Sequence, residues 1–170
     1  MSQFRIIERP AFEVIGKKIW ISGQDNDLFG IFWEECKAEG LFGIFEQING
    51  FQLGSQTNGV TLGISQVEKD PANRAFYYMI AIEKTKDDTD TGLECYQVPS
   101  STWAVFECRG TAPASIVESE IYAFTQWLPA SGFVHAPAPE MEVYLEGNNG
   151  DDYVCEFWLP VQRKDKASGR

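Results

Sequence analysis

The sequence predicts an α+β fold built from a duplicated β-α-β-β unit, with antiparallel sheets, two main helices on one face and a ligand cleft between the halves. Three observations support this prediction. Strand, helix, strand and strand follow one another before residue 84 and again after residue 93. Each predicted helix ends at a glycine, Gly40 or Gly132, and each half closes with an aromatic-rich strand, at 76–82 and 153–159. A repeated element pattern is typical of a duplicated unit.

The 170 residues are expected to form one domain over 1–170, with half-repeats at about 1–84 and 93–163 and a flexible tail at 164–170. One helix in each half of about 80 residues is too little to cover a sheet, so the halves should pack together.

In the first half, residues 4–8 and 12–21 are rich in β-branched and aromatic side chains and predict two strands separated by Pro10. A helix is predicted over 27–39, because residues 25–27 offer capping oxygens and apolar residues recur at helical spacing. The Asn58-Gly59 turn signal introduces a strand over 60–67, and the turn-forming segment 70–73 introduces one over 76–84.

In the second half, the polar stretch 84–92 predicts a solvated linker, followed by a strand over 102–108. Ser115 and Glu118 form an S-x-x-E capping box before a helix over 116–128, which Pro129 and Gly132 should end. Strands over 141–146 and 153–161 are joined by the loop-forming segment 147–152. The pattern predicts helices in these two places only.

Acidic residues outnumber basic ones by 25 to 14, which gives the chain a formal net charge of −11. A field of that sign repels phosphates, so we expect no nucleic-acid partner. Apolar runs are too short for a membrane span and the N-terminus lacks the order of a signal peptide, so we expect a cytoplasmic protein with no membrane partner. The 12 Phe, 6 Tyr and 5 Trp exceed the needs of a core of this size, and some should line a ligand site.

Residues that carry catalysis or hold metals are sparse. The four cysteines, at positions 36, 95, 108 and 155, show no C-x-x-C spacing, which favours buried free thiols. His135 is the single histidine, so no Ser-His-Asp set can be assembled. No glycine pattern offers a cradle for nucleotide phosphates. We therefore expect no metal, no cofactor and no catalytic residue.

The last two predicted strands carry the most informative side chains. Alternation assigns their odd-numbered positions to the core beneath the helices. The even-numbered positions, Glu142 and Tyr144 on one strand and Glu156 and Trp158 on the next, should then share one outward surface. An acidic, aromatic surface that lines a cleft suits an organic cation. The alternative is an ordinary solvated strand face on which Trp158 covers a sheet edge.

Three segments resemble the GyrI-like effector-binding domains, which also form the effector domain of AraC-type and multidrug-responsive transcription regulators. These segments are the ending Glu156-Phe-Trp-Leu-Pro-Val161, the upstream Glu142-Val-Tyr144, and residues 99–110 around Trp103. The resemblance implies that Glu156 lies in an aromatic cleft between the halves and pairs with cationic ligands. It also implies that Trp103 stands where the family often has tyrosine. The regulators add a helix-turn-helix segment that these residues leave no room for, so we expect a stand-alone domain.

We expect a binding domain for amphipathic, cationic or aromatic small molecules that acts by sequestration or sensing, without catalysis. The expected ligand-binding residues are Glu156, Trp158, Trp103, Tyr144, Glu142 and Trp33. Two alternatives stay open. A hydrolase of reactive natural products could use Glu156 and Glu142 as bases if the aromatic walls raise their pKa. A gyrase-inhibitor-like modulator could compete for a basic protein surface. A homodimer or a protein partner stays open as well.

Overall fold

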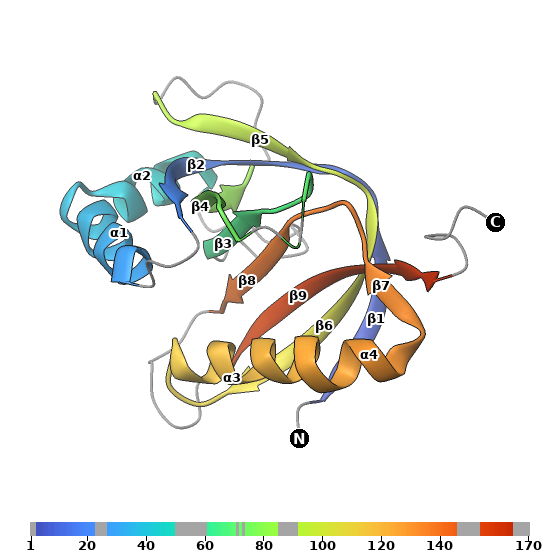
Figure 1. Ribbon diagram of the computed structural model, residues 1–170. Coiled ribbons are helices and arrows are strands. Elements are labelled where there is room, and N and C mark those ends of the chain that lie inside the picture. Colours follow the sequence, from blue (N-terminus) through green and yellow to red (C-terminus); the bar gives the residue numbers. More distant parts are fainter. Residues whose placement is uncertain are drawn as a thin grey trace.

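The computed structural model describes residues 3–22, 27–49, 61–70, 72, 74–84, 92–145 and 154–164. Within this part of the chain, an antiparallel nine-stranded sheet carries helices on one face (Figure 1). The strands are β1 (Phe4–Arg9), β2 (Phe12–Ile21), β3 (Thr61–Gln66), β4 (Phe76–Glu83), β5 (Glu94–Val98), β6 (Ser101–Arg109), β7 (Phe133–His135), β8 (Glu140–Tyr144) and β9 (Val154–Arg163). The helices are α1 (Asp27–Ala38), α2 (Leu41–Asn49) and α3 (Ala114–Tyr122), which continues through a π-helical segment, η1 (Ala123–Trp127), into α4 (Leu128–Ser131). The prediction of an α+β fold with an antiparallel sheet is confirmed.

The two halves of the chain exchange their first strands. The strand order is β1-β6-β9-β8-β3-β4-β2-β5, with β7 paired to β9. Strand β1 comes from the N-terminal half but pairs with β6, whereas β5 comes from the C-terminal half but pairs with β2. Strands β3 and β8 join the halves at the centre of the sheet. Each half is therefore completed by a strand from the other, which ties both halves into one sheet.

The helices cover the two ends of the same sheet face and leave its centre open. At one end, α1 and α2 pack on β2 and β4 through side chains that include Phe32, Cys36 and Phe45. At the other end, α3 and η1 pack on β6 and β9 through Ile116 and Trp127. Strands β3 and β8 lie between these two clusters, so the centre of the sheet lies between α1 and α3 (Figure 1).

The opposite face of the sheet is also apolar and buried. Its cluster draws on strands from both halves, with Leu62 and Met79 from the first and Trp103, Met141 and Trp158 from the second. The described helices all pack on the other face, and the arch of β2 and β5 in Figure 1 shows how strongly the strands bend. The sheet thus curls around this cluster and buries it with its own strands.

The prediction of helices in two places only is wrong, because the structure contains a further helix, α2. Gly40 has a φ of +82° and ends α1, as its position in the sequence suggested, but the chain turns there and enters α2 directly. The nine residues of α2 are too few to form a stable helix alone. Leu41, Phe45 and Ile48 are buried against α1 and the sheet, and this tertiary packing stabilises the helix.

The second predicted helix begins two residues early, at Ala114, and continues past Pro129 to Ser131. The predicted capping box does not form, because the Ser115 hydroxyl donates a hydrogen bond of 3.3 Å to the carbonyl of Gly110 instead. Pro129 is tolerated because it lies in the first turn of α4, just after η1. Gly132, with a φ of +80°, ends the helix as predicted. None of the described helices is long and apolar enough to cross a membrane.

Several sequence predictions fall wholly or partly outside the described residues. They are the helix-capping residues 25–26, the turns at 58–59 and 70–73, the body of the linker at 85–91, the loop at 147–152 and the tail from 165.

Candidate functional site

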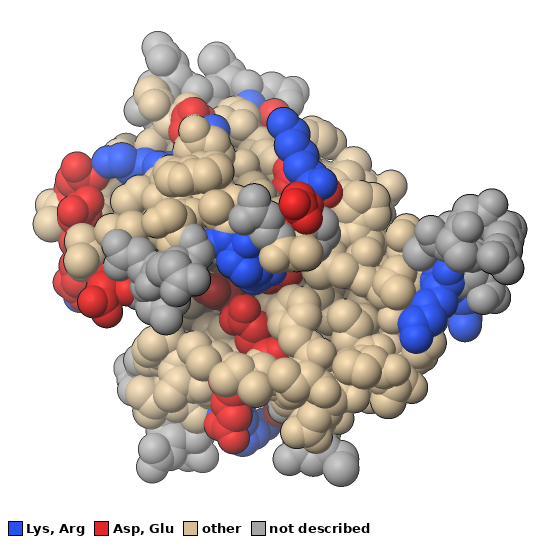
Figure 2. All heavy atoms as spheres, viewed as in Figure 1, with Lys and Arg blue, Asp and Glu red and all other residues tan. Residues whose placement is uncertain are grey.

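An open cavity of about 1160 Å³ lies between α1 and α3, over the centre of the sheet. Figure 2 shows the hollow from the side viewed in Figure 1, with acidic side chains inside it. The wall from α1 includes Phe29 and Trp33, and the wall from α3 and η1 includes Ile116, Glu120 and Phe124. The floor and back are formed by side chains of β4 and β8 and of the segment before β4, namely Arg74, Phe76, Tyr78, Glu142 and Tyr144.

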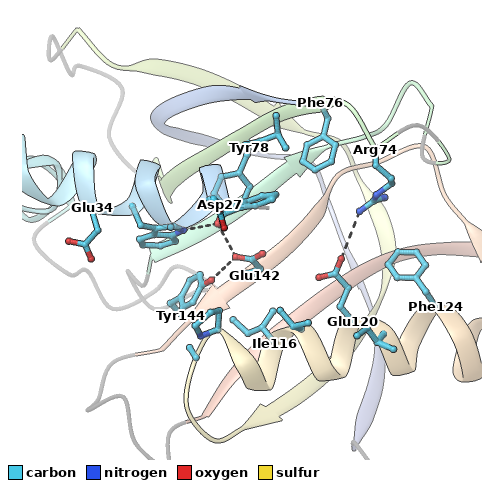
Figure 3. Close-up of a pocket in the computed structure, with 18 of the residues that line it drawn as sticks. Asp27, Glu34, Arg74, Phe76, Tyr78, Ile116, Glu120, Phe124, Glu142 and Tyr144 are labelled. Atoms are coloured by element: carbon cyan, nitrogen blue, oxygen red, sulfur yellow. Dashed lines mark hydrogen bonds and ion pairs between the residues drawn. The ribbon is translucent and has the colours of Figure 1, made fainter. Parts of the chain in front are cut away.

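Two tyrosine side chains hold the carboxylate of Glu142 at the floor, and Trp33 supports one of them (Figure 3). The Tyr78 hydroxyl donates a hydrogen bond of 2.9 Å to Glu142 Oε1, and the Tyr144 hydroxyl donates one of 2.6 Å to the same oxygen. The Trp33 indole Nε1 in turn donates to the Tyr78 hydroxyl at 3.0 Å. This chain of donors fixes the position of one carboxylate oxygen, so that the other can act as an acceptor for a ligand.

Gly63 makes this close approach possible. It pairs with Glu142 across β3 and β8, and Tyr78 enters the same space from β4. A Cβ atom at position 63 would overlap both the Tyr78 hydroxyl and Glu142 Oε1. A glycine inside a strand often marks a point where other groups approach closely, and here those groups are the two that build the floor.

We therefore expect Gly63→Ala to push Tyr78 away from Glu142 and to lower the free energy of unfolding by about 1–3 kcal/mol, the range for an overpacked interior. Gly43→Ala is the matched control, because a Cβ atom at this exposed helical position meets nothing within 4 Å. Urea unfolding of both variants checks the prediction. Equal stability of the Gly63→Ala variant and the parent would show that the floor is loosely packed.

Burial governs the electrostatics of the floor. Burial raises the pKa of Glu142, and the nearby Glu140 adds to that rise, while the hydrogen bonds from Tyr144 and Tyr78 oppose it. Burial likewise raises the pKa of Tyr78 and of Tyr144, so both tyrosines keep their protons and act as donors. No ion pair to Glu142 forms among the residues that the structure describes. The cavity therefore holds a carboxylate without a cationic partner from these residues.

A second group of charges stands at the back of the cavity. Arg74 donates two hydrogen bonds to the buried Glu140, of 3.0 and 2.9 Å, and His135 Nε2 lies 2.9 Å from Glu140 Oε2. Burial by itself would raise the pKa of Glu140, but the bonds to His135 and Arg74 outweigh it and hold that pKa below its usual value. Arg74 Nη2 also lies 3.8 Å from Glu120 Oε1. Glu140 is thus paired, and Glu120 is only weakly so.

Burial raises the pKa of Glu120 to about 7, helped by Glu140 and Glu142 and opposed by Arg74. In the unfolded chain the same carboxyl loses its proton near pH 4.5. Between these two values the folded state holds the extra proton, so the contribution of Glu120 to stability is greatest below about pH 4.5, falls as the pH rises to about 7 and is constant above.

The Glu120→Gln variant should therefore gain stability relative to the parent as the pH rises from 5 to 8, because glutamine does not ionise. Urea midpoints of both proteins measured across this range, about pH 5 to 8, check the expectation. Two parallel curves would contradict it.

The structure brings together three of the six predicted site residues, Glu142, Tyr144 and Trp33. The ring centroids of Trp33 and Tyr144 are 4.9 Å apart in an edge-to-face contact. Trp33 and Phe29 lie one turn apart on α1, and this spacing presents both rings to the cavity.

The other three predicted residues, Glu156, Trp158 and Trp103, lie on the opposite face of the sheet. Glu156 pairs with Arg5 at 3.1 Å and accepts a hydrogen bond of 3.0 Å from Trp158 Nε1. Trp103 and Trp158 are buried with ring centroids 5.7 Å apart.

The prediction that Glu142 and Tyr144 share a surface with Glu156 and Trp158 is wrong. The register pairs Glu142 with Phe157, and Tyr144 with Cys155. Directly paired residues point to the same face, so the even positions of β8 lie with the odd positions of β9. Of these two strands, β8 contributes Glu142 and Tyr144 to the cavity, while Glu156 of β9 lies on the opposite face of the sheet.

Sequence reasoning missed Arg74, Tyr78 and Glu120. One signal for Glu120 was present: it lies between Ile116 and Phe124 at steps of four residues, so that a lone carboxylate interrupts an apolar helical stripe. Tyr78 and Arg74 carried no comparable signal, because their roles depend on contacts with β8.

Comparisons with known proteins agree with this fold. Residues 2–162 match the family model described as GyrI-like small molecule binding domain. The transcriptional regulator BrlR of Pseudomonas aeruginosa is 28% identical over 161 residues, which are 92% of this chain and 54% of the regulator. The chain thus spans about half the length of this curated relative.

Two solved structures show the same fold. SAV2435 bound to tetraphenylphosphonium superposes with a TM-score of 0.80 at 21% identity, covering 94% of each chain. The C-terminal domain of EcmrR superposes with a TM-score of 0.65 at 15% identity, covering 96% of this chain and 99% of that one.

Proposed function

Because the chain belongs to the family of GyrI-like small-molecule binding domains, we propose that the cavity between α1 and α3 binds amphipathic organic cations, with Glu142 as the anchor of the positive charge. The observation that carries the proposal is the Glu142 carboxylate. It is fixed by Tyr78 and Tyr144, surrounded by aromatic rings and without an ion pair among the described residues.

An uncompensated carboxylate removed from water is costly unless a cation or hydrogen bonds accompany it. The two tyrosine bonds compensate one oxygen, and a bound cation would compensate the charge. The rings of Trp33 and Phe29 line the cavity and are half-buried, so each can add cation–π attraction of about 0.5–2 kcal/mol. The net charge of −11 favours the approach of cations as well.

The likeness in fold to a protein bound to tetraphenylphosphonium, a cation with four aromatic rings, supports the same ligand class. We infer that the domain captures such molecules and either sequesters them or reports their presence to a partner. Trp33 and Tyr144 supply apolar surface, and Glu142 supplies selectivity for positive charge.

Calorimetric titration with tetraphenylphosphonium and with tetraphenylborate tests the proposal. The two probes share four phenyl rings in a tetrahedral arrangement and differ in the sign of their charge. The proposal expects the cation to bind at least about tenfold more tightly, the effect of about 1.4 kcal/mol of charge pairing. Equal affinity for both would reduce the site to a neutral aromatic pocket, and no heat with either would remove the proposal.

A further inference from the structure

The cavity holds a second half-buried carboxylate, that of Glu120, whose charge the protein leaves largely unmatched. Four carboxylates line this space among the described residues, on Asp27 and Glu34 of α1, Glu120 of α3 and Glu142 of β8, and Glu140 lies behind it. Arg74 is the one guanidinium among the described residues that line it. Arg74 is committed to Glu140 through two bonds of 3.0 and 2.9 Å, whereas its distance to Glu120 is 3.8 Å. Asp27 and Glu34 are exposed, where water screens their charge, whereas Glu120 and Glu142 are half-buried. Once Arg74 and Glu140 are paired, Glu120 and Glu142 therefore remain as the two half-buried acidic centres of the cavity.

The two centres lie on different walls. Glu142 rises from β8 at the floor, and Glu120 reaches in from α3, with both carboxylates turned toward the cavity in Figure 3. The Glu120 side chain is 33% exposed, so a ligand in the cavity can touch it. Ile116 and Phe124 flank it along the helix and add apolar surface on either side.

The surroundings of Arg74 show that this end of the cavity accommodates a planar cation. The Arg74 guanidinium carbon lies 5.4 Å from the ring centroid of Phe76 and 5.7 Å from that of Phe124, beside Glu120. An amidinium or guanidinium has the same planar donor geometry, which suits a carboxylate next to an aromatic ring.

We propose that Glu120 is a specificity-determining residue that selects dications, with one positive centre of the ligand on Glu142 and the other on Glu120. The proposal rests on the proposed function of the same cavity. It assigns the ligand class as elongated aromatic molecules that carry two amidinium, guanidinium or ammonium groups. The roughly 1160 Å³ of the cavity exceeds what a compact monocation fills, and leaves room for such a molecule.

Burial and the neighbouring carboxylates raise the pKa of Glu120 to about 7, which supports this role, because two acidic groups in one cavity resist being ionised together. A second positive centre relieves that repulsion. The test should be made near pH 8, where Glu120 is mostly ionised.

The experiment compares pentamidine, in which a flexible alkyl chain joins two benzamidinium groups, with its analogue that carries a neutral carboxamide in place of one amidinium. Each is titrated calorimetrically into the parent, Glu120→Gln and Glu118→Gln. Glu118 lies on the same helix but is exposed and does not line the cavity, so its variant controls for the change in net charge.

We expect Glu120→Gln to weaken pentamidine binding about tenfold and binding of the monocationic analogue less than twofold, as for the loss of one charged contact. Glu118→Gln should leave both affinities within twofold. The proposal is overturned if Glu120→Gln weakens both probes equally, or weakens pentamidine no more than Glu118→Gln does. If neither probe binds the parent, the proposed function itself fails, and that result is distinct.

Discussion

Glu142→Gln is expected to weaken tetraphenylphosphonium binding by about 10- to 100-fold, the range for losing a charged contact in a partly desolvated site. Glutamine keeps the shape of the side chain and removes its charge. The Tyr78 and Tyr144 hydroxyls can still donate to the amide oxygen, so the cavity should keep its form. Calorimetry near pH 8 measures the change, and a urea midpoint close to that of the parent shows that the variant is folded.

Glu156→Gln is the matched control, since it removes the same charge from the opposite face of the sheet. Its affinity for the cation should stay within twofold of the parent. If Glu142→Gln binds as tightly as the parent, or if Glu156→Gln loses as much affinity as Glu142→Gln, the anchor has been placed on the wrong face.

Arg74→Leu should destabilise the fold by about 2–4 kcal/mol, because it strips the bidentate partner from the buried Glu140. The Glu140 side chain is only 3% exposed, so water cannot replace the guanidinium. The contact with His135 remains and keeps the loss below that of a fully orphaned charge. Urea unfolding near pH 7 gives the difference in the free energy of unfolding.

Arg5→Leu offers the comparison, because Arg5 pairs with Glu156 while its own side chain is 54% exposed. We expect that variant to lose less than about 1 kcal/mol, as for an exposed ion pair. Equal losses from Arg74→Leu and Arg5→Leu would mean that the pair of Arg74 and Glu140 does not hold the back of the cavity in place.

Local patterns predicted most of the elements of this fold. Residue composition, turn signals and alternation located the β2, β4, β8 and β9 strands to within two residues of their ends, and Gly132 marked the end of the last helix. The repeated element order implied the antiparallel α+β architecture. These features depend on short stretches of chain, so the order of side chains in the sequence is enough to predict them.

Local patterns could not predict which side chains of two neighbouring strands share one face of the sheet. Alternation correctly separated Glu156 from Phe157, and Glu142 from Val143, but it could not say which set of β8 joins which set of β9. That choice depends on the register, and a shift of one residue exchanges the two faces. The composition of the segment that joins these strands predicts a loop but not its turn geometry, so the sequence did not show which residues of β8 pair with which residues of β9.

Long-range pairing explains the remaining differences. The exchange of β1 and β5 between the halves depends on which strand edges meet, and no local pattern records that. Arg74 becomes part of the cavity because Glu140, 66 residues further along the chain, lies buried behind it. Glu120 was the exception, since its place in an apolar stripe was visible beforehand.

The position of a bound cation shows whether Glu142 is the anchor of the positive charge. Crystals of the protein grown with tetraphenylarsonium can be measured at the arsenic absorption edge, where an anomalous difference map locates the positive centre. We expect a peak in the cavity between α1 and α3, beside the Glu142 carboxylate and among the rings of Trp33, Tyr78 and Tyr144. A peak on the opposite face beside Glu156 and Trp158, with none at Glu142, would contradict this expectation.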